Sequence, residues 1–209
     1  MTSFKHKLNL FHRYPYWAKA KCIYIHVPKA AGTSINKAVF GRTLGHYKAT
    51  EIQKRFPKLF KKSFVFSVVR NPWSRIYSAY QFAKIGKTES MGINQPEKYQ
   101  IPAFDSFETF LFDWLATKNI EELDFVFQPQ HAFIYDEQGH LLTDFVGKVE
   151  TLTSDIKVIN KKLGRSITIP HANKTSTGKS YKEAYLNQEM IDIVQRIYAK
   201  DIELFGYEY

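Results

Sequence analysis

Lys29 lies in a short turn between an apolar run and a pair of hydroxyl residues, Thr33 and Ser34. A helix that begins after such a turn presents unpaired backbone N–H groups and the positive end of its dipole, and both attract an anion. Lys29 would add a full positive charge, and Gly32 would let the backbone approach the ligand closely. The segment therefore predicts a phosphate-binding turn; an ordinary strand-to-helix turn capped by Thr33 or Ser34 is the alternative.

A second segment has the same order of parts. Arg70 follows the apolar run 64–69, and the fixed φ of Pro72 suits the first turn of a helix. An arginine pairs bidentately with a phosphate, and Ser78, two turns into that helix, can reach the same group. Ligands of parallel sheets bind outside the carboxyl ends of the strands, so Lys29 and Arg70 would face one crevice. One ligand with two separated phosphates would satisfy both turns.

Apolar periodicity supplies the elements that must position these residues. The residues 23–27 predict a buried strand followed by a helix at 33–40, and the run 64–69 is typical of a central parallel strand. The residues 84–103 show no period and predict a long loop. The first later element that we expect is a helix beginning at Asp105 with Glu108 as its capping-box partner. The segments 132–135 and 141–149 predict a hairpin or a short pair of strands. A helix at 152–163 ended by Gly164, a strand at 167–169 and a last helix around 191–202 follow.

This alternation of strands and helices predicts an α/β fold, a three-layer sandwich around a mostly parallel sheet, in one domain over residues 1–209. Thirty Lys and Arg against 20 Asp and Glu give a net charge of +10, which favours anionic partners. The single cysteine excludes an intrachain disulfide. The first twenty residues hold no continuous apolar stretch, so we expect no signal peptide or transmembrane segment and a cytoplasmic location, unless the chain is trimmed from a membrane-anchored enzyme.

The two phosphate-binding turns together resemble the sulfotransferase family that uses 3′-phosphoadenosine 5′-phosphosulfate (PAPS), particularly its membrane-associated carbohydrate branch and bacterial relatives. The residues 28–34 are similar to the family's loop for the 5′-phosphosulfate. The residues 70–80 match its Arg-x-Pro-x-x-Arg-x-x-Ser-x-Tyr element for the 3′-phosphate. The likeness extends more loosely through 144–150 and 201–207. It implies a P-loop NTPase-like sulfotransferase fold and direct in-line sulfuryl transfer without a metal.

The resemblance also implies roles for individual residues. Lys29 would contact the bridging and sulfuryl oxygens of PAPS, and Arg70 and Ser78 would hold its 3′-phosphate. A late loop would cover the nucleotide through Asn173 and Lys174. The 5′-phosphate would lie against the turn made by Ala30, Ala31, Gly32, Thr33 and Ser34. Arg75 has two alternative roles: a structural ion pair with a buried carboxylate, or a contact with PAPS.

His46 is the candidate general base, because relatives of this kind place a catalytic histidine after a glycine between the two phosphate elements, and Gly45 precedes it here. Histidine has an unperturbed pKa of about 6.5, which suits proton abstraction near neutrality. His131 and Lys48 are weaker candidates for binding the acceptor. The resemblance implies that this acceptor is a carbohydrate, with an acidic polysaccharide as one candidate. His26, within the first strand, is expected to be packed in the core.

Two other functions compete with this interpretation. The segment 173–180 nearly fits the ATP-binding pattern Gly-x-x-x-x-Gly-Lys-Ser/Thr, which would indicate a nucleotide kinase or NTPase. Its first residue is Asn173 rather than glycine, and Pro170 interrupts the approach from the preceding strand. The basic run 54–62 could instead belong to a non-enzymatic binder of nucleic acid or polysaccharide. No base-reading motif supports nucleic acid, so we expect none as a partner.

Overall fold

The computed structural model describes residues 4–87, 92–93, 95–169 and 180–209. By its internal contacts the chain forms two compact units. The first comprises Met1–Val69 and Gln130–Ala172, and the second comprises Arg70–Pro129 and Asn173–Tyr209. The expected single domain over residues 1–209 stays a prediction.

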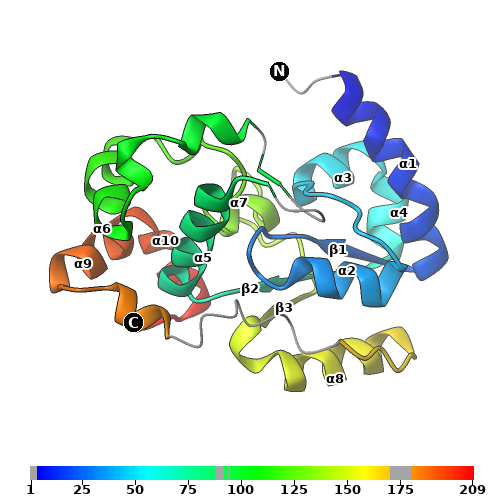
Figure 1. Ribbon diagram of the computed structural model, residues 1–209. Coiled ribbons are helices and arrows are strands. Elements are labelled where there is room, and N and C mark those ends of the chain that lie inside the picture. Colours follow the sequence, from blue (N-terminus) through cyan, green and yellow to red (C-terminus); the bar gives the residue numbers. More distant parts are fainter. Residues whose placement is uncertain (1–3, 88–91, 94, 170–179) are drawn as a thin grey trace. The chain divides into compact units, whose positions relative to one another are not determined.

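The first unit contains a parallel sheet of three strands in the order β1-β2-β3 (Figure 1). The strands are β1 (Cys22–Ile25), β2 (Phe64–Val69) and β3 (Phe145–Lys148). In the register, Cys22 lies opposite Phe64, and Phe66 lies opposite Phe145. The sheet and its flanking helices confirm the predicted α/β fold, and β1 and β2 are neighbours as the two-turn hypothesis requires.

Seven helical segments belong to the first unit of the described chain. They are α1 (Phe4–Ala20), α2 (Gly32–Phe40), α3 (Ala49–Arg55), α4 (Pro57–Lys62), α7 (His131–Ile134), the short 3-10 turn η5 (Val149–Thr151) and α8 (Leu152–Leu163). Gly164 ends α8 with a φ of 62°, the left-handed conformation expected of a C-cap glycine. The helix predicted at 152–163 therefore has the expected bounds.

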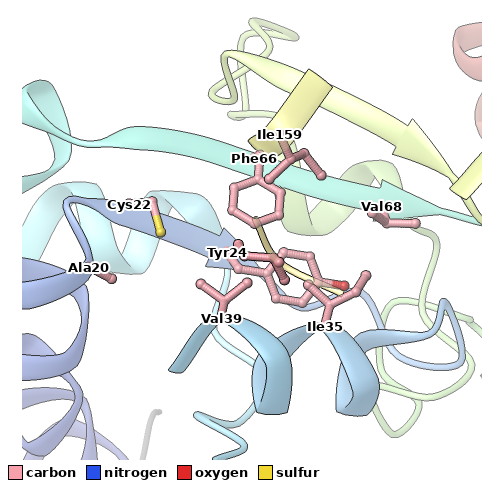
Figure 2. Close-up of a cluster of buried hydrophobic side chains, with 9 residues drawn as sticks. Ala20, Cys22, Tyr24, Ile35, Val39, Phe66, Val68 and Ile159 are labelled. Carbon is pink, nitrogen blue, oxygen red and sulfur yellow. The ribbon is translucent and has the colours of Figure 1, made fainter. Parts of the chain in front are cut away.

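Alternate residues of the strands enter a core beneath helices α2 and α8. Figure 2 shows Tyr24 and Phe66 of the sheet between Ile35 of α2 and Ile159 of α8. The residues that alternate with them, Ile23 and Val65 among others, are buried as well. Since successive side chains of a strand point to opposite faces, both faces of the sheet are covered. This explains why the strands are apolar almost throughout.

The second unit is helical in its described part. Its longer helices are α5 (Pro72–Ile85), α9 (Gln188–Ile197) and α10 (Ala199–Phe205). Its short segments are η1 (Pro96–Tyr99), η2 (Pro102–Phe104), α6 (Phe107–Thr109), the π-helical η3 (Phe110–Trp114), η4 (Leu115–Thr117) and η6 (Tyr181–Ala184). Stacked and edge-on aromatic rings fill its core, with Tyr80, Phe104 and Phe110 in mutual contact. Tyr80 is part of α5, so these rings pack against this helix, which begins at Pro72, two residues after Arg70.

Several expected elements differ from the structure. The segment 132–135 belongs mainly to helix α7, and the predicted hairpin is reduced to one antiparallel bridge between Tyr135 and Leu141. Strand β3 pairs with β2 instead, and its partly buried Phe145 packs against the core that includes Phe66. Ile167 forms no strand, since its backbone N–H and C=O both bond to the side chain of Asn160.

Two local predictions also shift. The capping box after residue 104 uses Ser106 and Thr109 rather than Asp105 and Glu108, since the hydroxyl of Ser106 accepts from the Thr109 amide at 3.0 Å. The expected loop 84–103 contains the short helices η1 and η2 in its described part. No helix in the described ranges is both long and apolar enough to cross a membrane.

Candidate functional site

The turn between β1 and α2 has a backbone suited to an anion. Lys29 and Ala31 both adopt left-handed conformations, with φ of 64° and 59°, at a cost of roughly 1–2 kcal/mol for each residue that is not glycine. Ala31 is the N-cap of α2 and has no side-chain oxygen to accept from the amides of the first turn. The first backbone bond of the helix runs from the Ile35 amide to the Ala31 carbonyl at 3.3 Å. The donor set of this helix start therefore suits a phosphate.

Gly32 has a second task that its sequence context does not reveal. A Cβ added to Gly32 would lie 1.8 Å from Cδ2 and 1.9 Å from Nε2 of His26. The imidazole of His26 therefore lies directly against the first residue of α2. Any side chain at Gly32 would displace this ring.

The imidazole rings of His26 and His46 lie in contact, tilted against each other. Their ring centroids are 3.9 Å apart with an angle of 36° between the ring planes. Nδ1 of His46 lies 3.0 Å from the backbone carbonyl oxygen of His26. A carbonyl oxygen can only accept a hydrogen bond, so Nδ1 of His46 must carry the proton and donate it. In the neutral ring, Nε2 then bears the free lone pair, which is the state that a general base requires.

The surroundings keep both histidines neutral. Burial lowers the pKa of His46 below its ordinary value; the bond to the His26 carbonyl opposes this shift, and the charge of Lys29 adds to it. Burial lowers the pKa of His26 much further, the neighbouring His46 adds to this shift, and a hydrogen bond to the Gly45 backbone opposes it. Nδ1 of His26 is buried without a hydrogen-bond partner among the described residues.

Asn36 connects the phosphate turn to the segment that carries His46. The Asn36 side chain is buried, and its amide group donates to the Gly32 carbonyl at 2.9 Å. Its oxygen accepts from the Leu44 amide at 3.4 Å, two residues before His46. Sequence reasoning missed Asn36, because a single polar residue in a helix pattern does not show which distant segment it bonds. It also missed the contact between the His26 and His46 rings.

The two weaker candidates lie on adjacent elements of the first unit. His131 begins α7 and is half-buried, and Lys48 immediately precedes α3. The ammonium nitrogen of Lys48 lies 5.9 Å from the centroid of the Phe133 ring in α7. The structure therefore brings Lys48 to the helix that carries His131.

In the second unit, Arg70 and two serines line the start of α5. Nε of Arg70 donates to the hydroxyl of Ser74 at 2.9 Å. Ser78 lies one turn further along and is buried. Asn71 caps the helix, because its side-chain oxygen accepts from the amides of Trp73 and Ser74 at 3.1 and 3.3 Å. Asn-Pro at a helix start is a capping signal that the sequence does contain.

Arg75 is part of the interior of the second unit. The side chain is 1% exposed, and its guanidinium donates to the carbonyl oxygens of Val126 and Gln128 at 3.3 and 2.6 Å. Burial lowers its pKa, and the nearby Tyr198 and buried Asp201 oppose that shift. These contacts support the structural role that was one of the two alternatives for this residue.

Asn173 and Lys174 lie outside the described residues, as does most of the ATP-binding-like segment 173–180. Within the described ranges, no group of three or more His, Cys, Asp or Glu side chains is arranged to hold a metal ion.

Comparison with known proteins gives one match. The chain matches the sulfotransferase family over residues 17–208, which include the turns that carry Lys29 and Arg70. No relative was found among the curated proteins, and no solved structure was found to match. The family assignment favours sulfuryl transfer over the nucleotide-kinase alternative. Because this match covers most of the chain, the protein is a member of the sulfotransferase family, a family of enzymes whose sulfuryl donor is PAPS.

Proposed function

We propose that this sulfotransferase transfers the sulfuryl group of PAPS to a carbohydrate hydroxyl, and that His46 removes the proton of that hydroxyl. The observation that carries this role is the bond from Nδ1 of His46 to the His26 carbonyl at 3.0 Å, which leaves Nε2 as the base. The lowered pKa of His46 keeps this nitrogen unprotonated at neutral pH. A neutral, fixed imidazole is what general-base catalysis needs.

Lys29 and the start of α2 are proposed to hold the phosphosulfate end of the donor. When bound, PAPS supplies a sulfuryl group attached through an oxygen to the 5′-phosphate, and in-line displacement at sulfur leaves negative charge on that phosphate. Lys29 would neutralise this charge. The 5′-phosphate would accept hydrogen bonds from the turn formed by Ala30, Ala31, Gly32, Thr33 and Ser34. The uncapped start of α2 and the effect of Lys29 on the pKa of His46 support this assignment.

Arg70 and Ser78 are proposed to hold the 3′-phosphate. Arg70 directly follows β2 in the chain, as the turn with Lys29 follows β1, and β1 and β2 are parallel neighbours. The bond between Arg70 and Ser74 shows that this guanidinium can reach hydroxyls on the face of α5 that also includes Ser78. Asn173 and Lys174 are proposed to cover the nucleotide.

The acceptor side of the proposal rests on His131 and Lys48. An ammonium group and an imidazole on adjacent elements suit a hydroxyl-rich, anionic acceptor such as an acidic polysaccharide. Nucleic acid is not proposed as a partner. The cytoplasmic location stays a prediction.

Replacing the base separates catalysis from binding. We expect His46→Ala to lower kcat by about 10²- to 10⁴-fold, the range of general-base catalysis, while the affinity for desulfated PAPS, measured by calorimetry, stays unchanged. His140→Ala removes an exposed histidine of a surface turn and serves as the control. Normal sulfation by His46→Ala would remove His46 from the proposed role.

Replacing Arg70 should weaken nucleotide binding, the property that His46→Ala leaves unchanged. Arg70→Ala removes a charged hydrogen-bond donor worth about 1.5–3 kcal/mol, so we expect desulfated PAPS to bind about 10- to 100-fold more weakly. Arg70→Lys keeps the charge but loses the bidentate fork, and its affinity should lie between those of Arg70→Ala and the unchanged chain. Unchanged calorimetric affinity in Arg70→Ala would contradict the assignment of the 3′-phosphate.

The acceptor class is tested directly. Incubation with radiolabelled PAPS and a panel of neutral and acidic polysaccharides should transfer label to at least one of them. Transfer to small alcohols or phenols alone would contradict the carbohydrate proposal and would leave the sulfuryl-transfer activity itself intact.

A further inference from the structure

The net positive charge of this protein comes entirely from its first unit. That unit holds 19 Lys and Arg against 6 Asp and Glu, a net charge of +13, whereas the second unit holds 11 against 14, a net charge of −3. The asymmetry is steepest in residues 1–69, where Glu51 is the single acidic residue beside 14 Lys and Arg. Glu51 bonds to His6 at 2.9 Å and to the Lys48 amide at 2.8 Å. Its carboxylate therefore has local partners.

Beside these charges, α1 exposes a row of apolar side chains. Leu8, Phe11 and Tyr14 are 48%, 40% and 43% exposed, and their spacing of three residues places them along one side of the helix. A different side of α1, which includes Leu10 and Trp17, is buried. The exposed row is therefore additional to the face by which α1 packs in the first unit.

Contacts between α1 and the α3–α4 segment join the row to the basic residues. The guanidinium carbon of Arg55 lies 3.9 Å from the centroid of the Phe11 ring. The Phe56 ring meets Phe11 and Tyr14 edge-on at centroid distances of 5.5 and 5.1 Å. Exposed ammonium groups follow along the same helices: Lys54, Lys58, Lys61 and Lys62. We call this surface, Leu8 to Tyr14 with residues 54–62, the α1–α4 patch.

We propose that the α1–α4 patch binds the surface of a membrane that contains anionic phospholipids. Apolar side chains along a helix that lies flat, with cations beside them, are the arrangement by which proteins bind at the boundary of headgroups and acyl chains. Each Lys or Arg near an anionic lipid surface adds to the attraction, so the five cations of residues 54–62 favour reversible attachment.

The exposed aliphatic and phenyl groups favour lipid over a soluble polyanion. An acidic polysaccharide would use the cations but would gain little from Leu8, whereas an acyl region would bury it. Arg55 already lies over Phe11, so its charge is held at the level of the apolar row. This inference does not depend on the proposed base or acceptor.

Vesicle flotation tests the proposal with the full chain. We expect binding to vesicles of phosphatidylcholine with phosphatidylglycerol, little binding to phosphatidylcholine alone, and a decrease in binding as salt is raised. The double variant Lys58→Glu, Lys61→Glu should bind at least about tenfold more weakly. The variant Leu8→Ser, Phe11→Ser keeps the charge and should also lose binding.

A matched variant separates the patch from net charge. Lys161→Glu, Lys162→Glu makes the same charge change on exposed residues of α8, outside the patch, and should retain most of the binding. Equal loss in both charge variants would overturn the proposal. So would patch-dependent retention on a heparin column without any vesicle binding, which would identify a polysaccharide surface. Affinity for desulfated PAPS should be the same in all these variants, and thermal melts verify that they are folded.

Discussion

At the scale of the residue, one missing Cβ determines the position of an imidazole. The His26 ring occupies the space where a side chain at Gly32 would lie, and the His46 ring contacts that ring at a tilt. The sequence predicted a packed His26 and a base at His46, and the packing of His26 is confirmed. The role of His46 stays a proposal. The sequence separation of His26 and His46 gave no sign that their rings would be in contact, because this contact depends on the path of the chain between them.

Gly32→Ala tests this packing. The new methyl group would overlap His26, so we expect a loss of about 1–3 kcal/mol in the free energy of unfolding and a lower kcat, because the shifted ring moves His46. Thermal melts and sulfation rates measure the two effects. Gly41→Ala, at the other end of α2, meets no atom within 4 Å and should retain kcat although its φ of 74° is unfavourable for alanine. Unchanged stability and kcat in Gly32→Ala would contradict the inferred packing of the His26 ring against Gly32.

At the scale of the element, the local sequence pattern was sufficient to predict the secondary structure of some segments and not of others. The run 64–69 became β2 with the expected bounds, since an unbroken apolar stretch suits a strand covered on both faces. The segment 132–135 was expected to be a strand but lies mainly in α7, because short apolar runs fit a helix or a strand equally well. Strand β3 likewise could not be placed from local sequence, because its pairing partner β2 lies far from it in the chain.

Asn36 links two elements and yields the next prediction. Asn36→Ala leaves the Gly32 carbonyl and the Leu44 amide without this partner, so we expect a loss of about 1–3 kcal/mol in urea unfolding. We also expect a lower kcat with an unchanged KM for PAPS, because the segment before His46 is released while the phosphate turn remains. The neighbouring Lys37→Ala, at an exposed position, should leave both quantities unchanged. A parallel loss in both variants would indicate a general effect on α2.

At the scale of the whole molecule, buried neutral histidines make stability depend on pH. The pKa of His26 is well below 6.5 in the folded chain, and that of His46 is also lowered. The unfolded chain therefore takes up protons first as the pH falls, so stability is complete above about pH 6.5 and is lost below it. The slope should approach about 1.4 kcal/mol per pH unit for a histidine that stays neutral in the folded state.

Urea unfolding between about pH 7.5 and about pH 5.5 measures this slope. His46→Gln removes one of the two titrating rings and should flatten the dependence in part. An unchanged slope in His46→Gln, or a stability that rises as the pH falls, would contradict the inferred protonation states.

The sequence by itself determined the family, the parallel α/β fold, the two turns that follow β1 and β2, and the excess of positive charge. These properties depend on composition and on residues a few positions apart, which fix turns, helix starts and apolar periodicity. Only the tertiary structure decided the tautomer of His46, the packing of the His26 ring against Gly32, the burial of Arg75 and the grouping of exposed aromatic and basic residues in the α1–α4 patch. Each of these depends on segments far apart in sequence, which meet only when the chain packs.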